Sequence, residues 1–358
     1  MLEYSLRCKG CGCIYESSYR NQLCSKCGSN LEVVYGDGKG FRINGYEFWD
    51  YLDYLPDGKY RRYSVGGTKL IDAGDGLQLK LETTNPTRSF KDRGSVIEVA
   101  KAKEYGYEEL SCASTGNMAY SLSYYCGIEG FRIRVFISRD ANRYKLGLIK
   151  ETGAAKIVKV DGDFNLAMKN AEGYAKSKGA FVSGDYCYRK EGQKTIAYEV
   201  AAQSKGFDNI IVPIGNATLI SGIGKALAQM LDSGAIRSMP QIIGVQARGS
   251  APVAKAFITG SAPRYVRPNT MADAIAVGYP TFGEEALKAI RKTNGRVVTV
   301  TDSEMKTEQR LFLKEYGLLA EMSGVASVAA YRKLKLQGSR TVAIISGANL
   351  EENVELGR

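Results

Sequence analysis

The sequence of 358 residues contains no histidine. This absence excludes Ser-His-Asp triads, Cys-His pairs, histidine-liganded metal sites and an imidazole base. Acid–base chemistry near neutral pH must therefore come from a lysine, a carboxylate, a tyrosine, a thiol or a bound cofactor.

Long apolar runs are also missing. No run approaches the ~20 residues that a membrane-spanning helix needs, and the start "MLEYSLRCKG" does not have the pattern of a signal peptide. We therefore expect a cytoplasmic protein. Its 44% hydrophobic and 24% charged residues are ordinary for a globular chain, and the length allows two domains or one large one.

Acidic residues are outnumbered, with 38 Asp and Glu against 49 Lys and Arg, which gives a formal charge of +11. Such an excess attracts anions in general. The basic residues are scattered, and the densest group is "KYRRY" at 59–63. Because no basic arm or stripe stands out, we expect small anionic ligands rather than nucleic acid.

Five of the eight cysteines lie within the first 27 residues. Cys8 and Cys11 form one Cys-x-x-Cys pair, and Cys24 and Cys27 form a second. Twelve residues separate the two pairs, and each pair is followed by glycine. Four thiolates with this spacing can surround one tetrahedral Zn²⁺, and disulfides are less expected in a cytoplasmic protein. We predict a structural zinc ribbon, with Cys13 outside the ligand set. The alternative is a ribbon that has lost its metal.

Strand-like and helix-like segments alternate beyond residue 75. The expected strands are 77–83, 110–113, 133–138, 155–160, 210–214, 241–246, 296–300 and 341–346. The expected helices are 90–104, 117–126, one from Phe164, 218–231, one capped by Asp302 or Ser303, and 323–336. Alternation with almost continuously apolar strands predicts an α/β fold of mostly parallel sheets covered by helices on both faces.

Three loops that follow predicted strands suit an anionic, planar ligand. In such sheets ligands bind beyond the carboxyl ends of the strands. The loop 113–121 offers hydroxyl and amide groups at a helix start, where backbone N–H groups attract anions. The loop 213–223 has glycine and small residues that let amides approach a phosphate, and 345–349 places Ser346 after a strand.

The neighbourhood of Lys91 makes this prediction specific. The stretch "NPTRSFKDRG" (85–94) resembles NPTGSFKDRG of the threonine synthase family, whose lysine covalently binds pyridoxal 5'-phosphate (PLP). The resemblance continues in "CASTGNMA" (112–119), "YRKEGQKT" (188–195), "TMADAIAVGYP" (270–280), "EMSGVASVAAY" (321–331), the ribbon and "FWDYLDYLP" (48–56). It implies a fold-type II PLP enzyme, similar to the tryptophan synthase β-subunit, with two open twisted sheets and an N-terminal zinc ribbon.

The resemblance also implies roles for individual residues. Lys91 would bind PLP and act as the base at the substrate Cα, for which its amine must be partly neutral. Ser346 would face the pyridine nitrogen, which suits β- and γ-elimination or replacement better than transamination. The residues implied to contact PLP are Lys91, Phe90, Asn117, Gly215, Asn216, Ala217, Thr218, Leu219 and Ser346.

Threonine synthase converts O-phosphohomoserine and water into L-threonine and phosphate, so a second phosphate-binding group is implied. Arg189 stands where the family has such an arginine, and a guanidinium suits this task. The residues implied to bind substrate are Ser114, Thr115, Gly116, Arg189, Arg88 and Lys69, with Arg143 and Lys145 as further cations.

Several positions depart from the family pattern. "SGDYCYR" (183–189) replaces NSxNPxR, "RDANRYKL" (139–146) replaces GKxAxGKL, and Met118 replaces a threonine. Lys69 replaces the proline of GGTPL, Arg88 replaces a glycine, and "SGANLEE" (346–352) is more similar to the threonine and serine dehydratases. An alternative function is therefore β-elimination from threonine or serine, or β-replacement on an O-phosphorylated amino acid. A zinc-ribbon nucleic-acid binder without catalysis is the alternative from another class.

The pattern predicts three regions. These are a zinc ribbon at 1–38, a large PLP-binding domain from 39–95 and 186–358, and a small α/β domain at 96–185. We expect a homodimer that acts on a small anionic amino acid, with no nucleic-acid or membrane partner.

Overall fold

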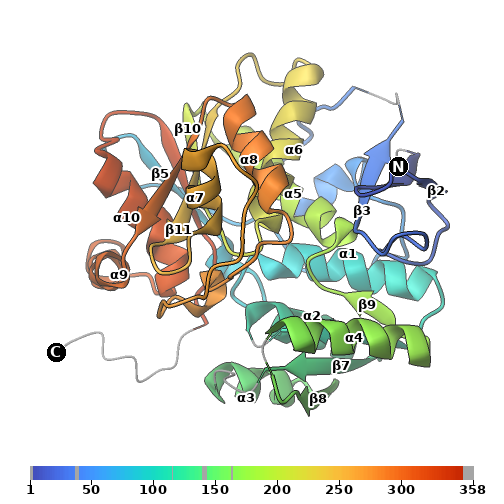
Figure 1. The fold of residues 1–358 in the computed structure, drawn as a ribbon. Coiled ribbons are helices and arrows are strands. Elements are labelled where there is room, and N and C mark those ends of the chain that lie inside the picture. The colour runs from blue at the N-terminus through green and yellow to red at the C-terminus, as the bar shows by residue number, and fades with distance from the viewer. Residues whose placement is uncertain (1–2, 37–39, 115, 139–142, 163, 350–358) are drawn as a thin grey trace. The chain divides into compact units, whose positions relative to one another are not determined.

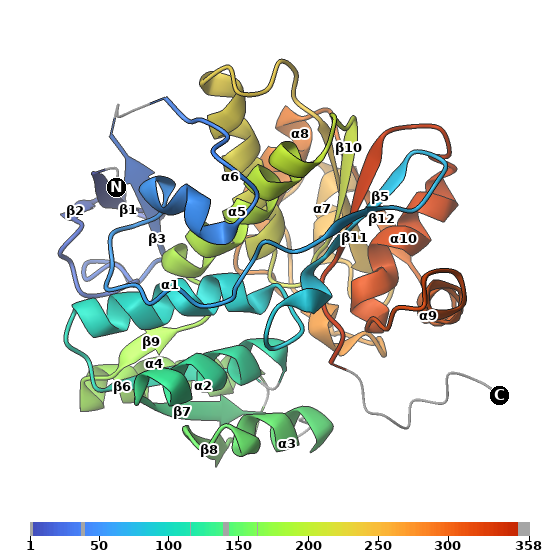
Figure 2. The ribbon, with the colours of Figure 1, turned by 180° about the vertical axis from the view of Figure 1, so that it is seen from behind.

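The computed structural model describes residues 3–36, 40–114, 116–138, 143–162 and 164–349 (Figures 1 and 2). Its contacts divide the chain into two compact units. Unit 1 comprises Met1–Gly40, Tyr51–Ser64 and Lys91–Gly192, and unit 2 comprises Phe41–Asp50, Val65–Phe90 and Gln193–Arg358. The ribbon thus shares a unit with residues of the predicted small domain, and the chain crosses between units at Lys91. Among the described residues, no helix is long and apolar enough to cross a membrane.

Unit 1 begins with the ribbon, an antiparallel sheet of three strands in the order β2-β1-β3. The strands are β1 (Tyr4–Cys8), β2 (Ile14–Glu16) and β3 (Leu31–Tyr35). Alternate residues of β1 and β3 are apolar and buried, including Leu6, Leu31 and Val33. This period of two is the pattern of a strand with one covered face.

The second sheet of unit 1 is parallel and has the order β8-β7-β6-β9. Its strands are β6 (Glu109–Ala113), β7 (Arg132–Ile137), β8 (Ala155–Lys159) and β9 (Phe181–Ser183). The accompanying helices are α1 (Lys91–Glu104), α2 (Asn117–Glu129), α3 (Arg143–Glu151), α4 (Phe164–Lys178) and the start of α5 (Cys187–Gln203). α4 lies in front of the sheet in Figure 1 and α2 in front of it in Figure 2, so they cover opposite faces.

Unit 2 contains a six-stranded sheet in the order β12-β11-β10-β13-β5-β4. The strands are β4 (Leu70–Asp72), β5 (Leu77–Leu81), β10 (Asn209–Pro213), β11 (Gln241–Ala247), β12 (Arg296–Val300) and β13 (Thr341–Ile345), and only the β4–β5 pair is antiparallel. The helices are α6 (Thr218–Asp232), α7 (Pro252–Thr259), α8 (Gly283–Lys292), α9 (Asp302–Tyr316) and α10 (Met322–Leu334). The described residues also form 3₁₀ turns at η2 (Glu82–Thr84) and η3 (Asp273–Ile275) of unit 2 and at η1 (Phe48–Tyr54), whose residues belong partly to each unit.

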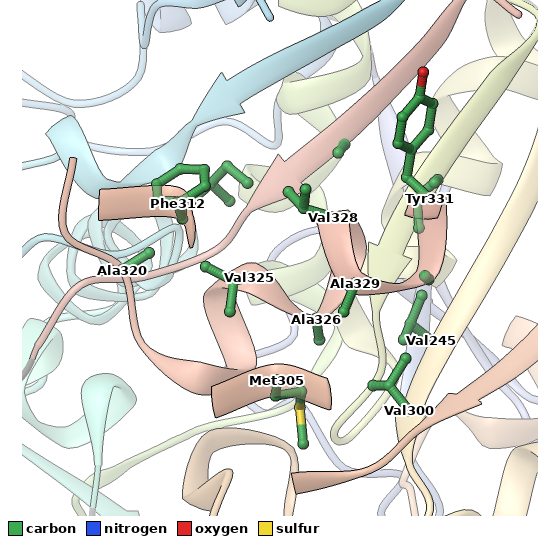
Figure 3. Close-up of a cluster of buried hydrophobic side chains, with 14 of the residues drawn as sticks. Val245, Val300, Met305, Phe312, Ala320, Val325, Ala326, Val328, Ala329 and Tyr331 are labelled. Carbon is green, nitrogen blue, oxygen red and sulfur yellow. The ribbon is translucent and has the colours of Figure 1, made fainter. Parts of the chain in front are cut away.

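The core of unit 2 forms where α9 and α10 pack on this sheet (Figure 3). Val325 and Val328 of α10 are fully buried, as are Val245 of β11 and Val300 of β12. Burial of each such side chain contributes roughly 1.5–3 kcal/mol to folding. Alanines on α10 keep the helix close to the strands.

The predicted mostly parallel α/β fold is confirmed, and two local expectations need correction. The helix α9 is capped by Thr301, not by Asp302 or Ser303. The Thr301 hydroxyl accepts the Glu304 N–H (3.1 Å), and the Glu304 carboxylate accepts the Thr301 N–H (2.6 Å), which is a capping box. Four helices, α3, α5, α7 and α8, were not predicted. The first half of α5 is rich in charged residues, although the structure buries them.

Candidate functional site

The predicted metal ligands gather at one end of the ribbon. The sulfur atoms of Cys8, Cys11, Cys24 and Cys27 all lie within 4.8 Å of one another. The Cys8 and Cys27 sulfurs are 3.4 Å apart, and those of Cys11 and Cys24 are 3.6 Å apart. Four Zn–S bonds of ~2.3 Å in a tetrahedron place the sulfurs about 3.8 Å apart, so the cluster fits Zn²⁺.

Hydrogen bonding favours the thiolate form at two of these cysteines, Cys24 and Cys27. At Cys11 a backbone bond from Cys13 lowers the pKa, but the bonds to the neighbouring cysteine sulfurs outweigh it and raise the pKa. The Tyr15 hydroxyl lies 3.0 Å from the Cys24 sulfur, and this bond lowers the pKa of Cys24 to about 6. A bond to Ser29 lowers the pKa of Cys27. Because the thiolate is the form that binds metal, both shifts suit a metal centre.

Lys91 is the first residue of α1, and its side chain is 17% exposed. Burial lowers the pKa of Lys91, and the nearby charge of Arg189 adds to that effect. Asp185 opposes it, because its carboxylate oxygen lies 3.9 Å from the Lys91 ammonium nitrogen. Burial thus favours the neutral amine, which is the form that covalent binding of an aldehyde cofactor requires.

Two glycines from the motifs let α1 and α5 approach closely. A side chain at Gly94 would collide with Arg189, and one at Gly192 would collide with the backbone of Arg93. Gly94 belongs to "FKDRG" and Gly192 to "EGQKT". The two motifs therefore contact each other in unit 1.

A buried ion pair lies beside this crossing. Arg189 and Glu98 are fully buried and form a salt bridge. Arg189 also donates to the carbonyls of Gly184 (2.9 Å) and Lys91 (3.1 Å) and to the Ser95 hydroxyl (3.2 Å). Its guanidinium is thus directed at acceptors within unit 1. That Arg189 binds a substrate phosphate remains a prediction, and Glu98 supplies the anion that neutralises it here.

The same ion pair holds the residue before Asp185. The Gly184 N–H donates to Glu98 (2.8 Å), and the positive φ of Gly184 (152°) favours glycine there. Burial raises the pKa of the Glu98 carboxyl, and its bonds to Arg189 and Gly184 oppose that rise. Asp185 and Glu98 were missed in the sequence. The signal was the departure "SGDYCYR", which introduces a carboxylate beside the lysine.

The loop at the start of α2 lies in the same unit. Asn117 is buried at the first position of α2, and the Gly116 N–H donates to the Ser114 hydroxyl (3.3 Å). Thr115 lies outside the described residues. The α2 residue Ser121 donates to the buried Asp92 of α1 (2.6 Å), so the two helices that begin at Lys91 and Asn117 are joined.

Unit 2 carries the predicted phosphate loop. Ala217 has a positive φ (67°), which turns the chain into α6 at Thr218. A Cβ on Gly215 would lie only 2.9 Å from the Ala274 carbonyl, so the loop needs a glycine there. The first N–H groups of a helix have no partner within it. Small residues at a turn into such a helix start fit a phosphate group.

The segment before Lys91 pairs with the chain after β13 in unit 2. The Phe90 N–H donates to the Ser346 carbonyl (3.1 Å), and the Ala348 N–H donates to the Arg88 carbonyl (2.9 Å). The Asn349 side chain donates to the Thr87 carbonyl (2.9 Å). Ser346 is buried, with 7% of its surface exposed. Because the Phe90 N–H bonds the Ser346 carbonyl, the predicted cofactor residues Phe90 and Ser346 are neighbours.

The predicted substrate cations have different environments. Arg88, Lys69 and Arg143 are exposed, whereas Lys145 is buried. Arg88 has a positive φ (57°), which explains why a glycine suits this position in the family motif.

Comparison with known proteins places this chain in a class. A family model described as pyridoxal-phosphate dependent enzyme matches residues 62–347. A threonine deaminase from Solanum lycopersicum has the same fold (TM-score 0.71, 20% identity, 89% of this chain and 97% of that one). A maize serine racemase is similar too (TM-score 0.70, 23% identity, 80% and 89%). Site and fold together are those of a fold-type II PLP-dependent enzyme.

The relatives narrow the class. The threonine synthase of Methanocaldococcus jannaschii is 33% identical over 377 residues, covering 97% of this chain and 92% of the relative. That of Methanosarcina acetivorans is 33% identical over 374 residues, with the same coverage. The chain belongs to the threonine synthase family.

Proposed function

We propose that this chain converts O-phosphohomoserine and water into L-threonine and phosphate. The match to threonine synthases over nearly the whole chain, together with a buried Lys91 whose pKa is lowered, carries the proposal. PLP, when bound, supplies an electron sink for negative charge that develops at the substrate Cα.

The residues of this chain would divide the remaining tasks. Lys91 would hold the cofactor and move the proton at the substrate Cα, for which its neutral form is needed. The turn from Gly215 to Leu219 would hold the cofactor phosphate, and Ser346 would face the ring nitrogen. Ser114 and Gly116 would bind the substrate carboxylate at the start of α2.

The direct test is product analysis with the PLP-loaded protein. We expect O-phosphohomoserine to yield phosphate and threonine in equal amounts, and Lys91→Ala to yield neither. Phosphate release without threonine, or no reaction, would rule out this function.

A second candidate is favoured by the two carboxylates near Lys91. Asp185 lies 3.9 Å from the lysine nitrogen, and Glu98 already neutralises Arg189. Two negative charges about 5 Å apart repel by roughly 3 kcal/mol at an effective dielectric constant of 20. A phosphate leaving near Asp185 would meet this repulsion, whereas a hydroxyl leaving group would not.

The second candidate is therefore β-elimination from serine or threonine, in which the proton that Lys91 removes from the substrate Cα would pass through the Asp185 carboxylate to the departing hydroxyl, which leaves as water. β-Replacement on an O-phosphorylated amino acid would meet the same repulsion as the first candidate. Keto-acid release from serine or threonine would support elimination, and release of phosphate from O-phosphoserine only with an added nucleophile would support replacement.

A further inference from the structure

Several ribbon residues contact α1 and α5, and one of them, Gln22, is fully buried and bonds both a residue of α1 and one of α5. Its side-chain amide donates to the Val182 carbonyl (2.9 Å) and to the Glu98 carboxylate (3.4 Å). Its side-chain oxygen accepts the N–H of Tyr188 (3.2 Å) in the first turn of α5 and lies 3.7 Å from the Cys187 sulfur. Both polar ends of Gln22 are thus used by unit 1 outside the ribbon.

The contacts of Gln22 lead to Lys91 in few steps. Glu98 pairs with Arg189, and Arg189 donates to the Lys91 carbonyl (3.1 Å). Gln22 also holds the start of α5, two residues before Arg189. A shift of Gln22 would therefore act on both ends of the Glu98–Arg189 pair, which holds the backbone of Lys91.

The position of Gln22 depends in turn on the cysteine cluster. Gln22 precedes Cys24 by two residues, and its carbonyl accepts the Leu31 N–H (3.2 Å). Within the same turn, the Cys24 N–H donates to the Ser29 carbonyl (2.9 Å). Formation of such a knuckle is coupled to metal binding, because the metal joins its cysteines to those of the other pair.

We propose that Gln22 is a positioning residue that couples metal binding at the four cysteines to the placement of Lys91. The ribbon is then part of the support of the PLP lysine. The proposal rests on Lys91 carrying PLP, which is a part of the proposed function, and not on the identity of the substrate.

The test uses the visible absorption of lysine-bound PLP, titrated with pH in the full chain without substrate. Gln22→Met keeps the size of the side chain and removes its hydrogen bonds. Tyr107→Phe is the matched control. The Tyr107 hydroxyl also donates to the ribbon, at the Arg20 carbonyl (2.8 Å), but this hydrogen bond is exposed and does not involve Glu98. Metal content and far-ultraviolet circular dichroism are recorded for each protein.

We expect Gln22→Met to retain its metal and PLP and to shift the pH midpoint of the visible band upward by at least about 0.5 unit. Burial and Arg189 both lower the pKa of Lys91, so a looser Arg189 and more water raise the pKa of its nitrogen. Tyr107→Phe should leave the midpoint unchanged. With the true substrate, kcat of Gln22→Met should fall about 10-fold, whereas KM should change by less than 2-fold. The variant affects the placement of the lysine and not the binding of substrate.

Removal of the metal from the wild-type chain by a chelator should produce the same shift, and in Gln22→Met it should add little. An unshifted midpoint in metal-free wild type, or in Gln22→Met, would overturn the proposal. Equal additive shifts would also overturn it, because Gln22 would then not be the link. If either metal-free wild type or Gln22→Met unfolds, the pH midpoint of the other protein tests the proposal. Unfolding of both would mean that Gln22 serves folding alone and would overturn the proposal. Absence of any PLP band in wild type would instead refute the cofactor role of Lys91.

Discussion

The ammonium nitrogen of Lys91 lies 3.9 Å from a carboxylate oxygen of Asp185, and both side chains are mostly buried, 17% and 8% exposed. Asp185 raises the pKa of Lys91 and so opposes the burial that lowers it. Asp185 therefore places a negative charge beside the Lys91 nitrogen and offsets part of the effect of burial.

Replacing Asp185 by asparagine removes this charge and keeps the size of the side chain. Burial and Arg189 then act on Lys91 against the charge of Glu98 but without that of Asp185, so we expect the pKa of the lysine to fall further. The amine would be neutral at lower pH, and the acidic limb of the pH–rate profile should move down by about 1 unit. The profile of kcat/KM between pH 6 and 10 measures this, and an unmoved limb would mean that the pair breaks on substrate binding.

The same variant separates the candidate substrates. If the leaving group is phosphate, Asp185→Asn should raise kcat/KM about 10-fold or more, because a like charge is removed. If a hydroxyl leaves and Asp185 protonates it, kcat should fall about 100-fold or more. Phosphate release from O-phosphohomoserine and keto-acid release from serine or threonine are measured with the same preparation. Asp185→Glu serves as the charge-preserving control.

We expect Lys91→Ala to fold, to lack the visible absorption of covalently bound PLP, and to show no turnover with any candidate substrate. The Lys91 side chain would supply the amine to which the cofactor is joined. The bond from Arg189 to the Lys91 carbonyl involves only the backbone of Lys91 and is kept in the variant. Lys255→Ala, at an exposed position on α7, is the control and should keep both colour and activity. A coloured Lys91→Ala protein would move the cofactor to another lysine.

Cys24→Ser should abolish stoichiometric metal binding, whereas Cys13→Ser should retain it. Cys24 is one of four clustered sulfurs, and Cys13 contributes its carbonyl to the Cys8 N–H (2.7 Å). Elemental analysis of protein from zinc-supplied cells provides the measurement. Equal metal content in the two variants would show that the four sulfurs are not the ligand set.

Arg88 allows stability and activity to be tested apart. Arg88 has a positive φ (57°), which costs a non-glycine residue roughly 1 kcal/mol, so Arg88→Gly should raise Tm by about 1–3 °C. Arg88→Gln keeps a side chain and removes the charge. If Arg88 binds the substrate anion, both variants should lower kcat/KM by roughly 30-fold. Normal kcat/KM in both would make Arg88 an exposed loop residue only.

Much of the fold could be predicted because its signals are local. Apolar strands such as β10 and β11 and the helix start at Thr218 lie where the pattern of residues predicts them. The four-cysteine cluster was equally predictable, since spacing alone brings such side chains together. The helix α5 could not be found by periodicity, because it buries polar residues such as Lys194 as well as apolar ones.

The site was harder to predict than the fold. Lys91 could be identified from its motif, but the partners that set its pKa lie far from it in sequence. Asp185 and Arg189 act on it only because the start of α5 and the residues just before it meet α1 in unit 1, and no residue pattern predicts that contact. Arg189 was predicted from its motif as a phosphate ligand, and the motif gave no sign of its buried partner.

The glycines of α1 and α5 have a consequence for how such sequences are classified. Gly94 and Gly192 are required by the close crossing of two backbones, whatever molecule the enzyme transforms. A match to "FKDRG" and "EGQKT" therefore reports the close packing of α1 on α5 and carries no information about the leaving group. Asp185 lies outside both motifs, and its carboxylate is 3.9 Å from the Lys91 nitrogen.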